Sequence, residues 1–521
     1  MSDDGDAMTG AESLVRTLVA GGVQVCFTNP GTSELHIVSA LDHTPELRCV
    51  LALFEGVATG AADGYARMAG EPACTLLHLG PGLANGLANL HNANRAHVPI
   101  INLVGQHPKY HLRHDAPLTS DIEAIARPFS KWVRTSQSSA EVGRDAAEAI
   151  AAARTALGRI ATLIVPADVA WSGGGSIDAL AAAPPDPSAS PDAIHRACEM
   201  LRAKQPTAIL LGGNGLYGQG LRIAGRIAAA TGAKLLAPYP FTRLERGSGI
   251  PPVQRVAYVR EQAIEQLDQF RQIILVGAKA PVSYFAYEGK SSEFIDPQCE
   301  LHTLGADGDD SVRALTALEG ELAASRTEPQ AEKPAPVQVP TGPITLDGLA
   351  AAIAATLPEG VIVADESMTS GRGILAATRG CAPHDWLACT GGSIGIAMPL
   401  AVGAAVASPS RRVLCLTADG SGMYTAQALW TMAREGLNIC TVVFANRVYG
   451  VLKREFSNLK VGEPGAIARN LFDIGRPDID WVSLAKGMGV PGQRVGTIDE
   501  FVTALRYGFE GEGPTLIEVP L

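Results

Sequence analysis

The sequence predicts an α/β protein made of three doubly wound parallel-sheet domains, and three observations support this prediction. The chain has 521 residues, a length that corresponds to roughly three domains of ordinary size. It is 46% hydrophobic and only 18% charged, as expected of parallel sheets that helices cover on both faces. Short apolar runs with the character of strands alternate with longer segments of helical pattern, which is typical of doubly wound sheets.

Two segments with the composition of linkers divide the chain. Residues 181–191 read AAAPPDPSASP and residues 326–342 read RTEPQAEKPAPVQVPTG, and both are rich in proline and small residues. The expected divisions are a flexible acidic tail (1–10), an N-terminal domain (11–180), a central domain (190–325), a linker (326–342) and a C-terminal domain (343–521).

The overall composition excludes several classes of protein. A formal net charge of −11 argues against nucleic acid as the main partner, because phosphate backbones attract basic surfaces. The chain has no apolar run long enough to span a membrane and no signal-peptide pattern. Its nine cysteines form neither a CxxC pair nor a zinc-binding spacing, as expected of reduced core thiols. We therefore expect a cytoplasmic protein that binds small molecules.

In the N-terminal domain, three segments predict an apolar strand that turns directly into a helix. They are residues 27–35 (FTNPGTSEL), 49–70 (CVLALFEGVATGAADGYARMAG) and 76–82 (LLHLGPG). Glu55 lies in the second segment, at the end of a short apolar strand, where burial disfavours the charged form of a carboxyl group. A single buried glutamate is more often structural than catalytic, so a catalytic role for Glu55 needs support from the rest of the chain.

The C-terminal domain contains the most informative segment, residues 411–450. Its apolar runs at 413–417 and 439–445 predict two buried strands. Residues 421–434 between them predict a helix, which Gly436 ends. This is a βαβ unit, whose right-handed crossover brings the carboxyl ends of both strands to the same edge of the sheet.

Two polar side chains stand at that edge. Asp419 follows the first strand and Asn446 ends the second. A carboxylate and an amide oxygen beside the N–H groups of a helix that begins at Ser421 suit Mg²⁺ holding a diphosphate. The alternative is an ordinary βαβ unit with an Asp-Gly turn at the surface.

This spacing resembles the thiamine-diphosphate motif, which begins Gly-Asp-Gly-Ser and closes with Asn. The resemblance implies five ligand positions: the side chains of Asp419 and Asn446 and the backbone carbonyl of Val448 for Mg²⁺, and Gly420 and Ser421 for the diphosphate. The chain departs from the motif at Ala418 and Arg447, and neither departure removes a metal ligand.

The N-terminal segments resemble the same family. The residues around Glu55, Glu-Gly-x-Ala-x-x-Ala-Asp-Gly-Tyr-Ala-Arg, are similar to the pyrimidine-domain signature. This implies that Glu55 hydrogen-bonds N1′ of the aminopyrimidine and activates the cofactor. Residues 27–35 match the substrate-side loop, so Thr32 would lie at the substrate carboxylate. His78 stands at the position of an active-site histidine of benzoylformate decarboxylase, which implies that it relays protons.

Two later loops complete the resemblance. Residues 365–369 (DESMT) and 391–395 (GGSIG) occupy the positions of the diphosphate and thiazolium loops of the family. The implied cofactor contacts are Thr369, Gly392 and Ile394, and Ile394 would wedge the cofactor into its bent shape. Each fragment alone could be a glycine-rich turn, but five fragments in the right order are hard to obtain by chance.

The resemblance extends from about residue 11 to residue 521 and is closest to the branch that includes benzoylformate decarboxylase and acetolactate synthase. It implies a pyrimidine-binding N-terminal domain, a diphosphate-binding C-terminal domain, and active sites between the subunits of a homodimer or homotetramer. Some members also carry FAD. We expect none here, because the glycine cluster at 212–215 is explained by a plain strand-to-helix turn.

The resemblance also predicts a substrate pocket, formed by Thr32, His78, Gln106, Tyr284, Phe285 and Val451. Benzoylformate decarboxylase has a second active-site histidine in its middle domain, whereas residues 277–290 contain none. Tyr284, Phe285 and Tyr287 stand there instead, and they either wall the pocket, pass a proton or serve only in packing. The missing histidine argues against benzoylformate as the substrate.

Two further groups of residues leave alternatives open. His107, His111 and His114 lack the spacing of a metal site on a helix, and His111 or His114 could instead reach the substrate channel. Lys453 and Arg454 either face solvent or favour a substrate with an additional acidic group.

These features predict a thiamine-diphosphate- and Mg²⁺-dependent 2-oxo acid decarboxylase or carboligase. In such enzymes the C2 ylid of the cofactor attacks the 2-oxo acid, CO₂ leaves, and an aldehyde or a 2-hydroxyketone is released. Two alternatives are an acetolactate-synthase-type condensation of two 2-oxo acids and a cofactor-binding homologue without catalysis. The presence of Glu55, Asp419 and Asn446 argues against the second alternative.

Overall fold

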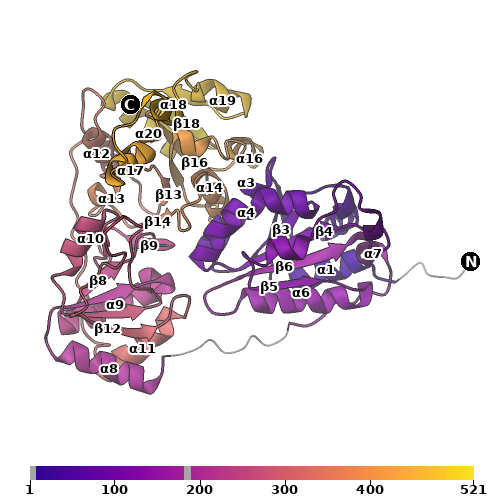
Figure 1. The fold of residues 1–521 in the computed structure, drawn as a ribbon, viewed down its shortest axis with the longest axis horizontal. Coiled ribbons are helices and arrows are strands. Elements are labelled where there is room, and N and C mark those ends of the chain that lie inside the picture. The colour runs from indigo at the N-terminus through magenta and orange to yellow at the C-terminus, as the bar shows by residue number, and fades with distance from the viewer. Residues whose placement is uncertain (1–6, 181–188) are drawn as a thin grey trace, which may run out of the picture.

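The structure of the chain, a computed structural model, describes residues 7–180 and 189–521. It contains three β-sheets with helices packed against their faces (Figure 1). Within these sheets one strand pair is antiparallel and the others are parallel, so the predicted class of three parallel-sheet domains is confirmed. The predictions of a flexible tail and of the first linker fall in part on residues 1–6 and 181–188, which lie outside the described residues.

The first sheet has the strand order β2-β1-β3-β4-β6-β5. The order reverses between β1 and β3, and ligands of doubly wound sheets bind at the carboxyl ends of the strands beside such a reversal. The strands are β1 (Val25–Asn29), β2 (Arg48–Leu51), β3 (Ala73–Leu77), β4 (Ile100–Gln106), β5 (Trp132–Thr135) and β6 (Ile160–Pro166). The helices are α1 (Gly10–Ala20), α2 (Leu35–Asp42), α3 (Glu55–Ala69), α4 (Leu79–Ala96), α5 (Ile122–Ala126), α6 (Ser139–Ala153) and α7 (Ala167–Trp171).

The second sheet has the order β10-β8-β7-β11-β12, and its reversal lies between β7 and β11. Its strands are β7 (Thr207–Leu211), β8 (Lys234–Ala237), β10 (Gln254–Arg255), β11 (Gln272–Val276) and β12 (Glu300–Gly305). Its helices are α8 (Pro191–Arg202), α9 (Gly218–Thr231), α10 (Arg260–Leu267) and α11 (Ser311–Leu322).

The third sheet has the order β17-β18-β16-β15-β13-β14-β9, and its reversal lies between β13 and β15. Its strands are β9 (Arg243–Arg246), β13 (Ile362–Glu366), β14 (His384–Ala388), β15 (Val413–Ala418), β16 (Ile439–Ala445), β17 (Gly492–Arg494) and β18 (Thr515–Pro520). Strand β9 comes from the central segment of the chain and pairs antiparallel with β14. The central and C-terminal segments are therefore joined by a continuous sheet.

The helices of the third domain include two short pieces where the sequence predicts one helix over 421–434. They are α15 (Asp419–Gly422) and α16 (Ala428–Arg434). Between these two helices, the hydroxyl of Thr425 donates to the carbonyl of Gly395 at 2.7 Å. This contact joins segments that are distant along the chain, so the local helical pattern did not predict it. The other helices are α12 (Leu346–Thr356), α13 (Ile374–Ala377), α14 (Ala397–Ala407), α17 (Gly450–Asn458), α18 (Ala466–Phe472), α19 (Trp481–Gly487) and α20 (Ile498–Glu510).

Helices α3 and α14 hold the first and third domains together, and both contribute to one hydrophobic core (Figure 1). Small residues let these helices approach closely. A Cβ atom at Gly64 would lie only 2.1 Å from the carbonyl oxygen of Leu400, and one at Gly403 would lie 1.9 Å from the carbonyl oxygen of Ala61. The predicted small-residue helix after Glu55 is thus an interface helix.

None of the helices within residues 7–180 and 189–521 is both long enough and apolar enough to cross a membrane.

Candidate active site

The carboxyl edge of the third sheet brings Asp419 and the residues after β16 together, as the βαβ interpretation predicts. Asp419 Oδ2 accepts a hydrogen bond from the backbone N–H of Arg447 at 2.7 Å, and Oδ1 accepts from that of Gly420 at 2.9 Å. The residue is only 3% exposed. Burial raises the pKa of the Asp419 carboxyl, and no ion pair in the described part of the chain includes this group. A bound cation would relieve the cost of burying its negative charge.

Asn446 connects the loops after β13 and β16. Its amide Nδ2 donates to the hydroxyls of Thr369, at 3.4 Å, and Ser370, at 3.3 Å. Its Oδ1 accepts from the backbone N–H of Val448 at 3.1 Å. Thr369 and Asn446, predicted separately as cofactor contacts, therefore lie side by side next to the reversal between β13 and β15.

The chemistry of this group of residues fits Mg²⁺ and a diphosphate. Asp419, Asn446 and Val448 offer a carboxylate, an amide and a backbone carbonyl oxygen, and Mg²⁺ prefers oxygen ligands. Gly420 and Ser421 are buried in the first turn after Asp419. No group of three His, Cys, Asp or Glu side chains suited to a metal occurs among the described residues, so the oxygen set around Asp419 is a different kind of site.

A second buried carboxylate, Glu366, stands at the end of β13. Its Oε1 and Oε2 accept from the backbone N–H of Gly395 at 2.9 and 3.0 Å, and Oε2 also accepts from those of Ile396 and Ala397. Burial raises the pKa of the Glu366 carboxyl to about 8, although these N–H groups act in the opposite direction. Glu366 thus fixes the loop that carries Gly392 and Ile394.

The N-terminal domain positions Glu55 as the first residue of α3. Its Oε2 accepts a hydrogen bond from the amide of Asn85 at 3.0 Å. The sequence predicts a buried carboxyl, whereas Glu55 is partly exposed in the single chain. The reason is that Glu55 is the first residue of α3, after the turn that follows β2, and is not part of the strand itself.

His78 lies next to Glu55. A Cβ atom at Gly82 would be 3.3 Å from Glu55 Oε1 and 3.4 Å from His78 Cβ, so both side chains border this glycine. The Nδ1 atom of His78 is 2.7 Å from Glu34 Oε2, and Glu34 is 0% exposed. The Oε2 atom also accepts from the backbone N–H of Gly31, at 2.8 Å.

The pairing of Glu34 with His78 occurs at the reversal of the first sheet. Glu34 lies in the turn after β1, where Thr32 also lies, and His78 directly follows β3. The ring of His78 packs onto Gly31 so closely that a Cβ atom there would lie 2.3 Å from Nδ1. A buried carboxylate on Nδ1 fixes the orientation of the ring and leaves Nε2 for another partner.

The two groups of residues are not joined directly. Among the described residues, no hydrogen bond or ion pair links Glu55 or His78 to Asp419 or Asn446. Another residue, Asn92 of α4, connects the first domain with the third by two hydrogen bonds to Ser393. The amide Nδ2 of Asn92 donates to the carbonyl of Ser393 at 2.8 Å, and the backbone N–H of Ser393 donates to Asn92 Oδ1 at 3.2 Å.

The predicted pocket residues are divided between these regions. Gln106 is buried at the end of β4, and its Oε1 accepts from the N–H of His107 at 2.8 Å. The ring of Tyr284 lies beside that of Phe285, with centroids 5.4 Å apart. The Tyr284 hydroxyl reaches Gly392, where φ is +76° and a Cβ atom would lie only 1.9 Å from that hydroxyl. Val451 is in the first turn of α17 and is partly exposed.

The three histidines after β4 stack in sequence. The ring centroids of His107 and His111 are 5.2 Å apart, and those of His111 and His114 are 5.6 Å apart. Burial lowers the pKa of His107, and the neighbouring His111 and His78 act in the same direction. This row of rings therefore extends from the active-site edge of the first sheet.

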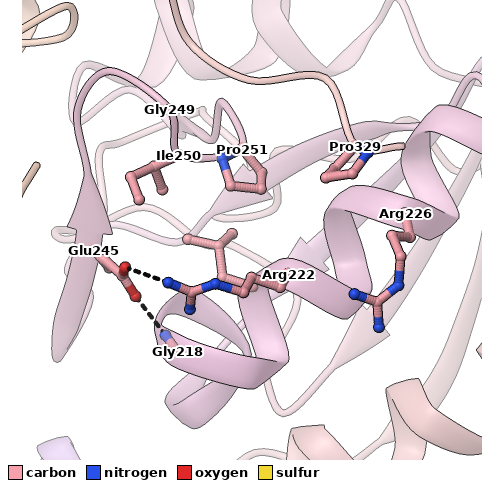
Figure 2. A pocket seen from close by; sticks show the side chains of 9 residues that line it. Gly218, Arg222, Arg226, Glu245, Gly249, Ile250, Pro251 and Pro329 are labelled. Carbon is pink, nitrogen blue, oxygen red and sulfur yellow. Dashed lines mark hydrogen bonds and ion pairs between the residues drawn. The ribbon is translucent and has the colours of Figure 1, made fainter. Parts of the chain in front are cut away.

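A cavity of about 160 Å³ lies elsewhere, beside α9 in the central domain (Figure 2). Its polar side chains bind each other: Glu245 accepts from Arg222 at 3.3 Å and from the backbone N–H of Gly218 at 2.6 Å. Arg226 pairs with Glu319. None of the predicted site residues lines this cavity.

Sequence reasoning assigned no role to Glu34, Glu366 or Asn92, which the structure places in contact with predicted site residues or their loops. Glu34 and Glu366 lie in segments that the resemblance singled out, and each is an acid at or just after the end of an apolar strand. An acidic residue at such a position was the signal in the sequence by which both could have been found. Asn92 belongs to the segment after residues 76–82 that also resembles the family, but its contact with Ser393 could not be predicted, because the two residues are 301 positions apart along the chain.

Comparison with known proteins finds family similarity at both ends of the chain. Residues 8–125 match the family described as "Thiamine pyrophosphate enzyme, N-terminal TPP binding domain". Residues 374–519 match "Thiamine pyrophosphate enzyme, C-terminal TPP binding domain". The first match contains Glu55 and His78, and the second contains Asp419 and Asn446.

Individual relatives are similar over nearly the whole chain. The Mycobacterium tuberculosis protein named "Putative acetolactate synthase large subunit IlvX" is 51% identical, over 98% of this chain and 99% of that protein. Benzoylformate decarboxylase of Pseudomonas aeruginosa is 27% identical over 96% of both chains. The solved thiamine diphosphate-dependent 4-hydroxybenzoylformate decarboxylase of Rhodococcus jostii is 25% identical with a TM-score of 0.84, over 98% of this chain and 99% of that one.

Proposed function

The chain belongs to the thiamine pyrophosphate enzyme family, and on this premise we propose that it is a Mg²⁺-dependent enzyme that decarboxylates a 2-oxo acid. The product is an aldehyde or, when a second carbonyl compound is the acceptor, a 2-hydroxyketone. The observation that carries this proposal is the buried, unpaired carboxylate of Asp419 beside Asn446 and Thr369 at the reversal of the third sheet.

The proposed roles follow from the contacts of each side chain. Asp419, Asn446 and the carbonyl of Val448 hold Mg²⁺, while Gly420, Ser421 and Thr369 bind the diphosphate. When bound, thiamine diphosphate supplies a carbon nucleophile and an electron sink for the loss of CO₂.

The N-terminal residues supply the acid–base groups. Glu55, which Asn85 orients, holds a proton at the pyrimidine ring. His78 moves a proton at the substrate through Nε2, because Glu34 holds its Nδ1. Thr32 binds the substrate carboxylate, and Gln106, Tyr284, Phe285 and Val451 border the substrate.

The complete site is proposed to form between subunits. Glu55 is partly exposed, and within the described residues of one chain no hydrogen bond or ion pair connects it with Asp419. A second copy would bring the Glu55 region of one subunit against the Asp419 region of the other, giving a homodimer or homotetramer.

A second candidate is the condensation of two 2-oxo acids, which the name of the 51% identical mycobacterial relative favours.

The proposed enzyme does not include FAD, and the glycine cluster of the central domain is explained by packing. Ser311 donates to the carbonyl of Gly212 at 3.1 Å, and a Cβ atom at Gly212 would lie 1.9 Å from the carbonyl oxygen of Gly277. The glycine at 212 is therefore explained by a close approach of the chain to itself, and FAD is left out of the proposal.

The test is CO₂ release from a panel of 2-oxo acids with thiamine diphosphate and Mg²⁺, with aldehyde and 2-hydroxyketone products measured together. We expect turnover that Glu55→Gln lowers by about 100-fold or more, a typical effect of losing an acid–base group. Glu46→Gln removes an exposed glutamate from the same domain and serves as the matched control. Undiminished turnover in Glu55→Gln would contradict the proposal, and acetolactate from pyruvate would favour the second candidate.

A further inference from the structure

Three tyrosines pack together beside the Gly391–Gly395 loop. The ring centroids of Tyr239 and Tyr258 are 5.1 Å apart, and those of Tyr258 and Tyr284 are 5.8 Å apart. We call these three residues the tyrosine cluster. Tyr284 links the cluster to the predicted cofactor loop, because its hydroxyl fills the space over Gly392. The cluster therefore forms one wall of the proposed site.

Two arginines lie on this wall. The guanidinium carbon of Arg255 is 5.1 Å from the ring centroid of Tyr239, and that of Arg454 is 5.2 Å from the centroid of Tyr258. Cation–π contacts of this kind hold a guanidinium in place without neutralising it. Burial raises the pKa of Tyr239 to about 12, so this ring stays uncharged beside the arginines at neutral pH.

Arg454 has hydrogen-bonding capacity that the described residues do not use. Its Nη1 atom is buried, and none of these residues forms a hydrogen bond with it. Its Nε is 3.3 Å from Glu455 Oε1, but Glu455 also accepts from the hydroxyl of Tyr287 at 2.7 Å and from the amide of Asn458 at 3.1 Å. A buried cationic N–H without a partner is costly, so this position is suited to an anionic ligand.

The other charges near the cluster leave this anion site open. Arg255 takes part in no ion pair within the described residues. Asp365, which acts electrostatically on both Arg255 and Tyr239, is buried and already accepts hydrogen bonds from Ser367 and Trp386. In the part of the chain that the structure describes, Glu455 pairs with Arg454 alone, and no carboxylate pairs with both arginines.

We propose that Arg454, together with Arg255 on the tyrosine cluster, binds a second anionic group of the substrate. The preferred substrates are then 2-oxo acids that carry a carboxylate or phosphate at the end away from the reacting carbonyl. This inference rests on the proposed function, since it assigns a substrate class to that site. It also gives a physical reason for the partly buried Arg454 on α17, the helix that begins beside Thr369.

The first test compares ligands of equal length. Calorimetric titration of the full chain, without cofactor and then with thiamine diphosphate and Mg²⁺, measures the affinities of 2-oxoglutarate and 2-oxopentanoate. We expect 2-oxoglutarate to bind roughly 10- to 100-fold more tightly, the effect of one or two hydrogen bonds to a charged group. The same titration with 4-phosphono-2-oxobutyrate separates a preference for phosphate from one for carboxylate.

The second test removes the arginine. Arg454→Gln is expected to abolish the preference for 2-oxoglutarate and to leave the affinity for 2-oxopentanoate unchanged. Lys453→Gln, one residue earlier on α17 and exposed, is the matched control and keeps the preference. Equal affinities in the unmodified protein would overturn the inference, and so would a preference that survives in Arg454→Gln. If this variant does not fold, the comparison of ligands in the unmodified protein still decides.

The outcomes also separate this inference from the proposed function. A preference in binding, with no CO₂ release from any 2-oxo acid, would support the anion site and contradict the proposed function. The opposite result is Glu55-dependent turnover of monocarboxylic 2-oxo acids with no preference for a second anionic group. It would support the proposed function and contradict the anion site.

Discussion

Single carboxylates in this protein owe their different roles to their partners. Glu34 is completely buried and bonded to His78, Glu366 is buried against three backbone N–H groups, and Asp419 is buried and forms no ion pair with another described residue. Each stands at or just after the end of a parallel strand, yet the first orients a ring, the second fixes a loop, and the third is suited to a metal ion. The difference lies in what faces each carboxylate and cannot be read from the residue type.

Removal of the Asp419 carboxylate should weaken metal binding. In Asp419→Asn we expect the apparent affinity for Mg²⁺, measured by calorimetry with thiamine diphosphate present, to fall by roughly 100-fold or more. Asp480→Asn, at an exposed helix cap in the same domain, is the control. An unchanged Mg²⁺ affinity in Asp419→Asn would contradict the assignment of this metal ligand.

Glu366 predicts a pH dependence of stability. Burial raises the pKa of its carboxyl from 4.5 to about 8, so between these values the folded protein holds a proton that the unfolded chain has released. Stability from this proton is complete below about pH 4.5 and is lost as the pH rises through 8. Glu366→Gln should reduce this loss by roughly 3 to 5 kcal/mol. Urea unfolding midpoints at pH 5 and pH 8 measure the effect, and identical pH profiles for both proteins would refute it.

At the scale of whole elements, the close packing of α3 against α14 depends on glycine at two contact positions, Gly64 and Gly403. A Cβ atom added at Gly64 or Gly403 would lie only about 2 Å from a backbone carbonyl oxygen of the other helix. Backbone atoms cannot move aside as a flexible side chain can. The same tight contact explains why a helix rich in glycine, which is intrinsically weak, is stable here.

Gly64→Ala is therefore expected to destabilise the protein by about 1–3 kcal/mol, through overpacking at the carbonyl of Leu400. Gly320→Ala is the matched control, because a Cβ atom at this position of α11 meets nothing within 4 Å. It should stabilise the protein by about 0.5–1 kcal/mol, the usual gain when a helix glycine becomes alanine. Thermal unfolding of both variants tests the pair, and equal shifts in the same direction would contradict the packing argument.

At the scale of the whole molecule, the two halves of the proposed site belong to different sheets. The Glu34–His78 pair and Glu55 lie at the reversal of the first sheet, whereas Asp419 and Asn446 lie at that of the third. A complete site then requires that two chains share their halves.

Mixing two inactive variants tests this sharing. If each site uses Glu55 from one subunit and Asp419 from the other, a heterodimer of Glu55→Gln and Asp419→Ala contains one intact site. Random exchange of subunits should restore about a quarter of the activity of the unmodified protein, since half of the dimers would carry one of two sites. The activity of the mixture after denaturation and refolding together is the measurement. No recovery, with heterodimers shown to form, would mean that each site lies within one chain.

Local patterns in the sequence were sufficient for much of this protein. The strand predicted at 439–445 is β16 (Ile439–Ala445), and the three-domain parallel architecture follows from the alternation of strands and helices. The juxtaposition of Asp419 with the residues after β16 also followed from the sequence, because right-handed crossovers leave few arrangements for a βαβ unit. The family was identified from the same short segments.

Only the tertiary structure decided the contacts between segments that are distant along the chain. The pairing of Glu34 with His78, the capture of the Gly395 loop by Glu366, and the entry of β9 into the third sheet all depend on which elements become neighbours. The break between α15 and α16 and the stacking of Arg454 on Tyr258 have the same origin. Periodicity and turn residues act over a few positions, whereas these contacts are stabilised only after the sheets have assembled and brought distant strand ends to one edge.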